Sequence, residues 1–139
     1  MIRCCTNSDV REIVDVINDA AKAYRGVIPD DRWHDPYMSP THLIKEIDDN
    51  VYFHGFANHD DCLLGVIGIQ DRGDVSLIRH AYVRTLARRK GIGGQLLKYA
   101  TKNIDKPLLV GTWKKAVWAI SFYEKHGFKT VSSEKTVRL

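Results

Sequence analysis

Cysteine is scarce in this sequence, and the few cysteines are poorly placed for structural chemistry. The chain of 139 residues has three of them, Cys4, Cys5 and Cys62. Adjacent cysteines cannot easily bridge each other and no C-x-x-C pair is present, which argues against a disulfide framework and against a zinc knuckle. Because free cysteine behaves as a small hydrophobe that is usually buried, we expect all three to be reduced and buried.

Long hydrophobic runs are also lacking. No apolar stretch approaches the roughly 18 residues needed to span a bilayer, and Met1 to Cys5 contain no apolar core of a secretory signal. We therefore expect a cytoplasmic location and no membrane partner. The six histidines are scattered, and no cysteine or carboxylate cluster repeats at the spacing of metal ligands, so the sequence predicts no metal site.

The length and the charge of the chain limit what it can be. Its 139 residues are enough for one domain with a single core, which we place over 1–139. The net charge of +4 is compatible with a nucleic-acid partner and equally with a polyanionic cofactor. The total charge does not decide between these partners, so the positions of the charged residues along the chain are used to distinguish them.

Hydrophobic spacing predicts the order of the elements. Apolar residues recur three and four apart after Thr6 to Asp9, which indicates an amphipathic helix, and Ser39-Pro40 is typical of a second helix start. The pattern predicts strands over 2–5, 51–57, 63–70, 75–83, 108–112 and 128–131, with helices over 10–24, 40–47, 92–104 and 116–126. The order β-α-α-β-β-β-α-β-α-β indicates one α/β domain with a mixed sheet.

A glycine-rich turn follows the strand over 75–83 and opens a helix. Its sequence is Arg88-Arg89-Lys90-Gly91-Ile92-Gly93-Gly94. The first N–H groups of a helix have no partner inside the helix, and the helix dipole is positive there. Glycine lets the backbone approach a ligand closely, and Arg84 adds a further positive charge before the turn. The segment therefore predicts an anion site at a helix N-terminus.

Three phosphate-binding motifs compete for this turn. A P-loop requires G-x-x-x-x-G-K-[ST], which the sequence lacks. A dinucleotide fingerprint requires G-x-G-x-x-G, and Leu96 occupies its last glycine position. The third pattern, [QR]-x-x-G-x-[GA], fits fully as Arg88-x-x-Gly91-x-Gly93. Taken alone, this short motif does not distinguish a phosphate site from a basic surface turn.

At this point the sequence resembles the GNAT superfamily of acetyl-coenzyme A-dependent N-acetyltransferases. Ala81-Tyr82-Val83 is similar to the end of the family's fourth strand, which leads into the glycine-rich turn. Further along, the segment 119–128 is similar to the family motif A-x-x-F-Y-x-x-x-G-F. The order of elements also resembles the family fold over essentially the whole chain. The resemblance implies the GNAT acyl-CoA N-acyltransferase fold, with acetyl-CoA as the acyl donor.

The same resemblance implies roles for single positions. Backbone groups at the end of the fourth strand would pair with the pantetheine arm, and backbone amides of the turn would hold the pyrophosphate. Tyr123 would be the general acid that protonates the departing thiolate, a role suited to its ordinary pKa of about 10; its alternative role is that of a core aromatic. The implied cofactor-binding residues are Ala81, Tyr82, Val83, Arg88, Arg89, Lys90, Gly91, Ile92, Gly93 and Gly94.

Two positions depart from the family pattern. Many members have an asparagine three residues before the motif alanine, and here Ala116 stands there, so we expect that cofactor contact to be lost or replaced. Members usually end with a seventh strand, whereas residues 136–139 predict a final strand that is short or missing. A missing strand would leave an exposed sheet edge, which makes a homodimer reasonable.

Catalysis also needs a group that accepts the proton of the acceptor amine, because only a neutral amine attacks a thioester. A glutamate on the fourth strand often takes it in the family, but 75–83 contains none. His80 is the titratable candidate for this catalytic role, and its alternative is a structural hydrogen bond. Under strict alternation Arg79 rather than His80 shares a face of the strand with Ala81. A β-bulge at this point would shift that alternation. Further candidates are Asp30, Asp31 and a water relay.

The segment 24–38 lies where family members build the acceptor pocket. Its arginines suit a carboxylate and its aspartates suit an amine, so the hypothesis is an amino-acid-like acceptor, and the alternative is a solvated loop. The candidate substrate-binding residues are Tyr24, Arg25, Asp31, Trp33, Tyr37 and Arg79.

The sequence therefore predicts an N-acetyltransferase. It would transfer an acetyl group from acetyl-CoA to a primary amine of a small molecule or protein, by direct attack in a ternary complex. Because the usual glutamate and asparagine are absent, a non-catalytic acyl-CoA-binding sensor is the alternative. A nucleic-acid-binding module would need a basic stripe with interleaved aromatics. The positive charge is instead gathered around one glycine turn, so we expect no nucleic-acid partner.

Overall fold

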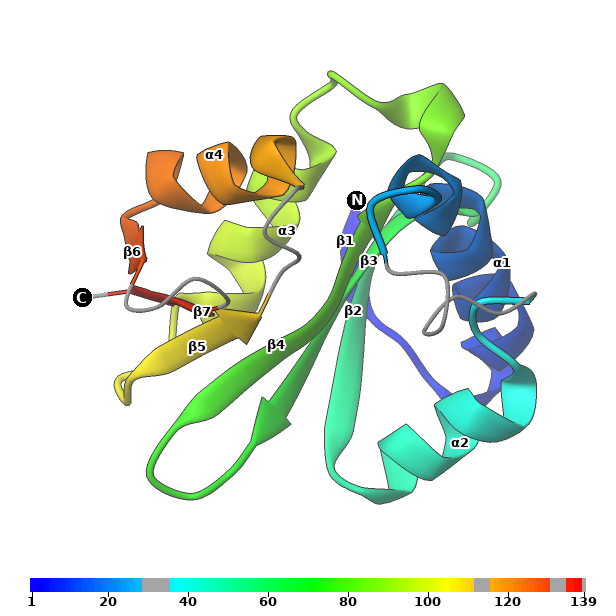
Figure 1. Cartoon of the computed structure of the whole chain (residues 1–139). Coiled ribbons are helices and arrows are strands. Elements are labelled where there is room, and N and C mark those ends of the chain that lie inside the picture. The colour runs from blue at the N-terminus through cyan, green and yellow to red at the C-terminus, as the bar shows by residue number, and fades with distance from the viewer. Residues whose placement is uncertain (29–35, 112–115, 131–134, 139) are drawn as a thin grey trace.

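The computed structural model of the chain describes residues 1–28, 36–111, 116–130 and 135–138. Its helices are α1 (Val10–Ala21), α2 (Pro40–Asp48), α3 (Ile92–Thr101) and α4 (Val117–Lys125), with 3₁₀ turns η1 (Asn7–Asp9), η2 (Lys22–Tyr24) and η4 (Thr85–Ala87). Its strands are β1 (Ile2–Cys4), β2 (Val51–Ala57), β3 (Leu63–Asp71), β4 (Ser76–Val83), β5 (Leu108–Gly111), β6 (Phe128–Thr130) and β7 (Lys135–Arg138). Figure 1 shows their arrangement. Within these described ranges no helix is long and apolar enough to cross a membrane.

The described strands form one mixed sheet in the order β1-β2-β3-β4-β5-β7-β6. Strands β1 to β4 are antiparallel, β4 and β5 are parallel, and β7 is antiparallel to both β5 and β6. The final strand, predicted to be short or missing, is present with four residues. It pairs on both sides, so the exposed edge expected from a missing strand does not form at this place.

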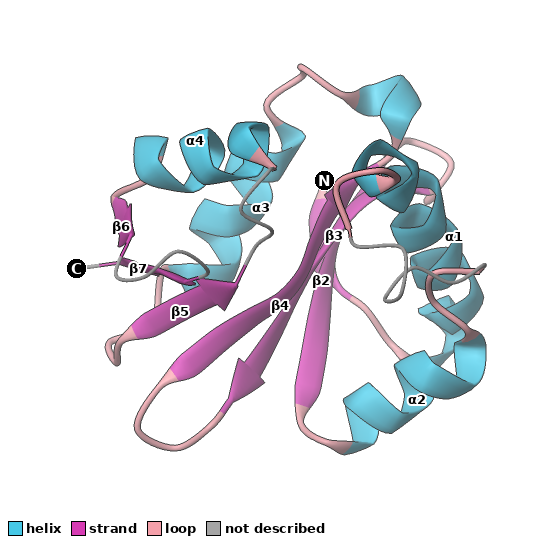
Figure 2. Ribbon diagram, viewed as in Figure 1, coloured by secondary structure: helices cyan, strands magenta, loops and turns pink. Residues whose placement is uncertain are grey.

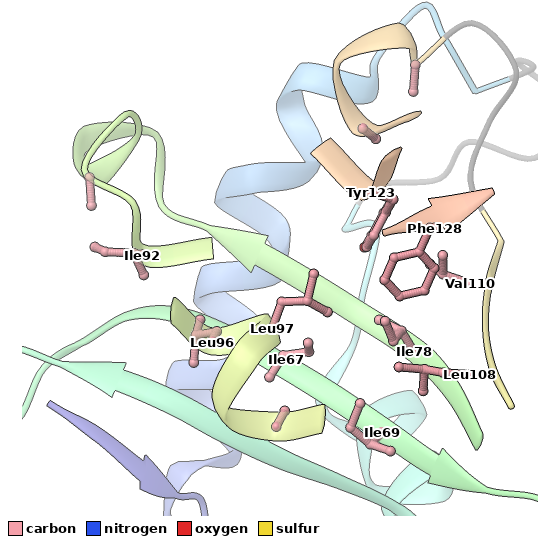
Figure 3. Close-up of a cluster of buried hydrophobic side chains, with 14 residues drawn as sticks. Ile67, Ile69, Ile78, Ile92, Leu96, Leu97, Leu108, Val110, Tyr123 and Phe128 are labelled. Carbon is pink, nitrogen blue, oxygen red and sulfur yellow. The ribbon is translucent and has the colours of Figure 1, made fainter. Parts of the chain in front are cut away.

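Helices cover both faces of the sheet (Figure 2). On one face α1 and α2 bury a cluster that includes Ile17, Leu43 and Val66. On the other face α3 and α4 bury a second cluster, which contains Ile69 and Leu96 (Figure 3). The central strand β3 contributes to both clusters, which is why its sequence is almost continuously apolar.

A local signal explains where α2 begins. Ser39 caps α2, because its hydroxyl oxygen accepts a hydrogen bond from the His42 backbone N–H at 3.1 Å.

The prediction of three buried cysteines is wrong: Cys4 and Cys62 are exposed, and only Cys5 is half-buried. Cys4 lies on the edge strand β1 and Cys62 lies in the turn before β3, where little covers a side chain.

The second cluster offers a test of the fold. Ile69 is fully buried at the centre of β3, whereas Ile44 on α2 is 47% exposed. We expect Ile69→Val to lower the free energy of unfolding by about 0.5–1.5 kcal/mol, because it deletes a buried methylene group. Ile44→Val should change it by less than about 0.5 kcal/mol. Urea denaturation measures both, and equal losses would contradict this packing.

Candidate functional site

Strands β4 and β5 pair over only part of their length. Their pairs run from Ser76 with Leu108 to Ile78 with Val110. Strand β4 continues to Val83 and still pairs with β3, but no described residue of β5 pairs with 80–83. Strand β5 ends at Gly111, and Figure 1 shows β4 continuing past the end of β5. Among the described residues, the edge of β4 over 80–83 therefore has no strand partner on the β5 side. Binding of an extended ligand by Ala81 to Val83 stays a prediction.

The free edge of β4 leads to an uncapped helix start. Gly91 is the N-cap of α3 and has a left-handed backbone, with φ +77° and no capping side chain. Arg89 is also left-handed, with φ +65°. The N–H groups of Ile92, Gly93 and Gly94 have no backbone acceptor in the described part of the chain. Such a turn directs backbone donors into a concavity that suits a pyrophosphate.

Cationic side chains surround this turn but do not all face solvent. Arg88, Arg89 and Lys90 are exposed. Arg84 is tied to β3, since its Nε donates to the Leu63 carbonyl at 2.7 Å. Three of the four positive charges predicted near the turn are therefore presented to a ligand, and the fourth fixes the path of the chain.

A carboxylate on α1 holds the segment that precedes the turn. Asp19 accepts a hydrogen bond from the Thr85 backbone N–H at 2.7 Å and one from its hydroxyl at 3.3 Å. Burial raises the pKa of Asp19, but the two Thr85 bonds and the charge of Lys22 outweigh it, so the pKa is lowered. The carboxylate therefore stays ionised and links α1 to the segment that leads into the glycine turn.

We expect this tether to support cofactor binding. Asp19→Ala should weaken acetyl-CoA binding about 3- to 10-fold, because one charge-assisted hydrogen bond contributes about 1.5–3 kcal/mol and only part of that is transmitted to the turn. Asp15→Ala is the matched control, one turn earlier on α1 with an exposed side chain. Titration calorimetry with acetyl-CoA measures both, and equal affinities would contradict the tether.

Tyr123 projects from α4 into the core on the α3 side (Figure 3). Its side chain is buried and packs edge-on against Phe122 at 5.1 Å and Phe128 at 5.4 Å between ring centroids. Burial raises the pKa of Tyr123, and the nearby Tyr24 adds to the rise. The hydroxyl therefore remains protonated at neutral pH, as a proton donor must.

An aromatic group connects the end of β4 with η2 and α4. Tyr24, at the end of η2, packs against Tyr82 on β4 at 6.0 Å and against Trp118 on α4 at 5.2 Å between ring centroids. Burial raises the pKa of both tyrosines, and Tyr37 contributes to the rise at Tyr82. Trp118 was not predicted for the site, because it is partly exposed and follows no periodic pattern.

His80 lies on the opposite face of β4 from Ala81. The β3–β4 register shifts at this point: His80 pairs with Gly68 and Ile78 pairs with Ile69, which leaves Arg79 as a bulged residue. The bulge proposed from the sequence is therefore present, but it does not bring His80 to the face of Ala81. His80 instead stacks near Tyr82, with 6.2 Å between ring centroids.

Glu46 on α2 is the partner of His80. The His80 Nε2 atom is hydrogen-bonded to the Glu46 carboxylate, at 3.1 Å from Oε2 and closer to Oε1. Burial raises the pKa of Glu46, but the hydrogen bond and charge of His80, with His42 and Arg79, lower it overall. Sequence reasoning missed Glu46, since its only local signal is the i, i+4 spacing from His42.

The predicted acceptor residues are only partly brought together. Tyr24 and the half-buried Tyr37 lie around Tyr82, and Asn18 fixes the end of the segment through reciprocal hydrogen bonds with the Met38 backbone, at 2.7 and 2.9 Å. Arg25 and Arg79 are exposed. The candidates Asp30, Asp31 and Trp33 lie outside the described residues.

Ala116 occupies the family's asparagine position. It is fully buried and precedes α4 as its N-cap residue. A methyl group cannot donate the hydrogen bond of an amide, so the side-chain contact expected from an asparagine is absent at this position.

Sequence and structure comparisons agree on the family. The family model described as the acetyltransferase (GNAT) domain matches residues 14–138. The chain belongs to this family of acetyltransferases, which use acetyl-CoA as the acyl donor, and the predicted fold class, cofactor and enzyme class are confirmed. No curated protein matches the sequence.

Solved structures share the fold at low sequence identity. The PaiA N-acetyltransferase from Thermoplasma acidophilum, solved in complex with coenzyme A, is 24% identical, with a TM-score of 0.80 over 99% of this chain and 96% of its own. A GNAT-family acetyltransferase from Staphylococcus aureus Mu50 is 20% identical, with a TM-score of 0.75 over 99% and 97%. An aminoglycoside 6'-acetyltransferase type Ii is 16% identical, with a TM-score of 0.75 over 99% and 96%.

Proposed function

We propose that this chain transfers the acetyl group of acetyl-CoA to a primary amine by direct attack in a ternary complex. The observation that carries the proposal is that, among the described residues, the β4 edge over 80–83 lacks a strand partner beyond the end of β5, ahead of the uncapped start of α3. An extended arm that ends in a pyrophosphate needs a free strand edge followed by unpaired backbone donors. The chain offers both in the required order.

The donor would be held mainly by backbone groups. The free edge of Ala81 to Val83 would pair with the pantetheine arm, and the amides of 89–94 would bind the pyrophosphate, with Arg88 and Lys90 adding charge. When bound, acetyl-CoA supplies an acetyl group activated as a thioester. Direct transfer needs no covalent acyl-enzyme.

Two side chains would manage the protons. The amine nitrogen bonds to the thioester carbonyl carbon, the carbon–sulfur bond breaks, and the excess proton on nitrogen passes to His80. Tyr123 gives its proton to the departing sulfur, so the products are an N-acetyl amine and a free thiol. His80 and Tyr123 then exchange protons with solvent to return to their starting states.

The acceptor is proposed to be a small amine that carries further polar groups. Exposed Arg25 and Arg79 suit a carboxylate, while Tyr24 and Tyr37 offer aromatic surface to a cation. One structural relative is an aminoglycoside acetyltransferase, so polyamine sugars belong in the test beside amino acids. The cytoplasmic location and the homodimer remain predictions.

A combined assay separates transfer from mere binding. We expect acetyl-CoA to raise the melting temperature, and we expect free thiol to appear when L-alanine, 1,4-diaminobutane, kanamycin or an alanine tripeptide is added. A melting shift without thiol from any amine would favour the acyl-CoA sensor. The absence of a melting shift would contradict the proposed cofactor site itself.

A further inference from the structure

The hydrogen-bonded pair of His80 and Glu46 is buried rather than exposed on the surface. Their side chains are only 11% and 12% exposed. His42 approaches the same carboxylate at 3.4 Å, but its side chain is 52% exposed. A buried carboxylate is costly to desolvate, and its pairing with a side chain is weak evidence for stability alone. Stability alone therefore does not explain why His80 and Glu46 are buried together, and their contact needs a role beyond holding α2 against the sheet.

The arrangement fixes which ring nitrogen of His80 carries the proton. The Nε2 atom faces both oxygens of the ionised Glu46 carboxylate. A carboxylate only accepts hydrogen bonds, so Nε2 must donate, and in the neutral ring Nδ1 then holds the lone pair. Nδ1 is buried and has no hydrogen-bond partner among the described residues. A buried polar atom without a partner calls for an explanation, and a proton supplied by a ligand or through a water would satisfy this lone pair.

Packing holds the ring in one orientation. His80, Gly68 and Phe53 lie in one row across β4, β3 and β2. Because Gly68 has no side chain, the Phe53 ring extends over it and stacks on His80, with 6.0 Å between centroids and 14° between planes. A Cβ atom at Gly68 would lie 2.9 Å from the Phe53 ring. The glycine is therefore required for this stacking.

The pair lies beside the proposed reaction site. The pairing of β4 with β5 ends at Ile78, and His80 follows after the bulged Arg79, at the start of the free strand edge. Tyr82, stacked near His80, also lies close enough to Tyr123 for that tyrosine's charge to affect it. His80 is therefore joined through Tyr82 to the aromatic group around Tyr24, to which Trp118 of α4, the helix that carries Tyr123, also belongs.

We infer that Glu46 is a positioning residue for His80, and that Nδ1 is the nitrogen that takes the amine proton. This inference rests on the proposed function. The proton moves from the amine nitrogen to Nδ1, directly or through one water, while the Nε2–H bond to Glu46 stays in place. The carboxylate keeps the ring in the required tautomer and stabilises the imidazolium formed in the step. Glu46 itself contacts no substrate.

A double-mutant cycle tests the inference with the fastest amine of the panel above. We expect Glu46→Gln to lower kcat about 10- to 100-fold, less than the full loss of a general base, with little change in the KM for acetyl-CoA. In a His80→Gln background, Glu46→Gln should cause no further loss, because Glu46 acts through His80. Asp48→Asn, an exposed carboxylate on the same helix, should keep the wild-type kcat.

Nitrogen NMR of the wild-type protein gives a second test that needs no functional variant. With ¹⁵N-labelled histidine, and His80→Gln used to assign the signal, we expect the neutral ring of His80 to carry its proton on Nε2. A proton on Nδ1 would overturn the inference. An unchanged kcat in Glu46→Gln, or equal losses in the wild-type and His80→Gln backgrounds, would also overturn it.

The inference and the proposed function fail in different ways. If the wild type acetylates an amine and Glu46→Gln is as fast, only the role of Glu46 is refuted. If the wild type binds acetyl-CoA but acetylates no amine, the proposed function fails and the inference fails with it.

Discussion

Replacing Tyr123 by phenylalanine is expected to lower kcat about 10²- to 10⁴-fold, the usual contribution of a positioned general acid. The substitution removes only the hydroxyl of a buried ring that packs against Phe122 and Phe128, so the fold should survive. Burial raises the pKa of Tyr123, and the same burial makes a departing thiolate more basic. The pKa of the proton donor and the pKa of the thiol that forms from the departing thiolate are thus both raised.

Acetyl-CoA binding distinguishes this chemical role from a structural one. In Tyr123→Phe the dissociation constant should stay within about twofold of the wild type, since the hydroxyl acts on the leaving group rather than on the bound donor. Tyr99→Phe, on the exposed face of α3, is the matched control and should retain full activity. An unchanged kcat in Tyr123→Phe would remove it as the acid, and lost binding would show a packing role.

Replacing Gly91 by valine is expected to weaken acetyl-CoA binding about 10- to 100-fold. A left-handed backbone costs a residue with a Cβ about 1–2 kcal/mol, and β-branched residues are the least tolerant. The turn would relax from φ +77° and redirect the donors at the start of α3. Each charge-assisted hydrogen bond lost in this way costs about 1.5–3 kcal/mol.

Gly73 provides the matched control for backbone strain. It has a similar left-handed φ of +85° with open space around it, but it lies in the turn between β3 and β4, at the end of β4 where pairing with β5 begins. Gly73→Val should lower stability without changing the dissociation constant for acetyl-CoA in titration calorimetry. Equal weakening by both variants would mean that strain, and not the anion site, accounts for the loss.

Much of the fold could be predicted because its signals are local. The spacing of apolar residues, the Ser39-Pro40 start and the glycine turns each act within a few residues, and the predicted strand over 51–57 agrees with β2 at both ends. The final strand was harder to predict. Its four residues are held by β5 and β6 on either side, and that support depends on segments distant in sequence.

The features of the candidate site also differ in how far the sequence could predict them. The glycine turn is contiguous, so its shape could be inferred from Arg88 to Gly94 alone. Glu46 could not be found, because it meets His80 only when α2 packs on β4, 34 residues away. Alternation alone placed His80 on the opposite face of the strand from Ala81, as observed, but the bulge at Arg79 depends on the pairing of β3 with β4 and could not be located from the sequence.

Transfer of a labelled acetyl group tests the central claim most directly. Acetyl-CoA labelled with ¹³C in the acetyl carbons is incubated with the chain and each amine of the panel, and mass spectrometry follows the amine while a thiol reagent follows coenzyme A. We predict one labelled acetyl group on an amine for each thiol released, and loss of both in Tyr123→Phe. Thiol release without a labelled amine, or no release with any amine, would contradict the account.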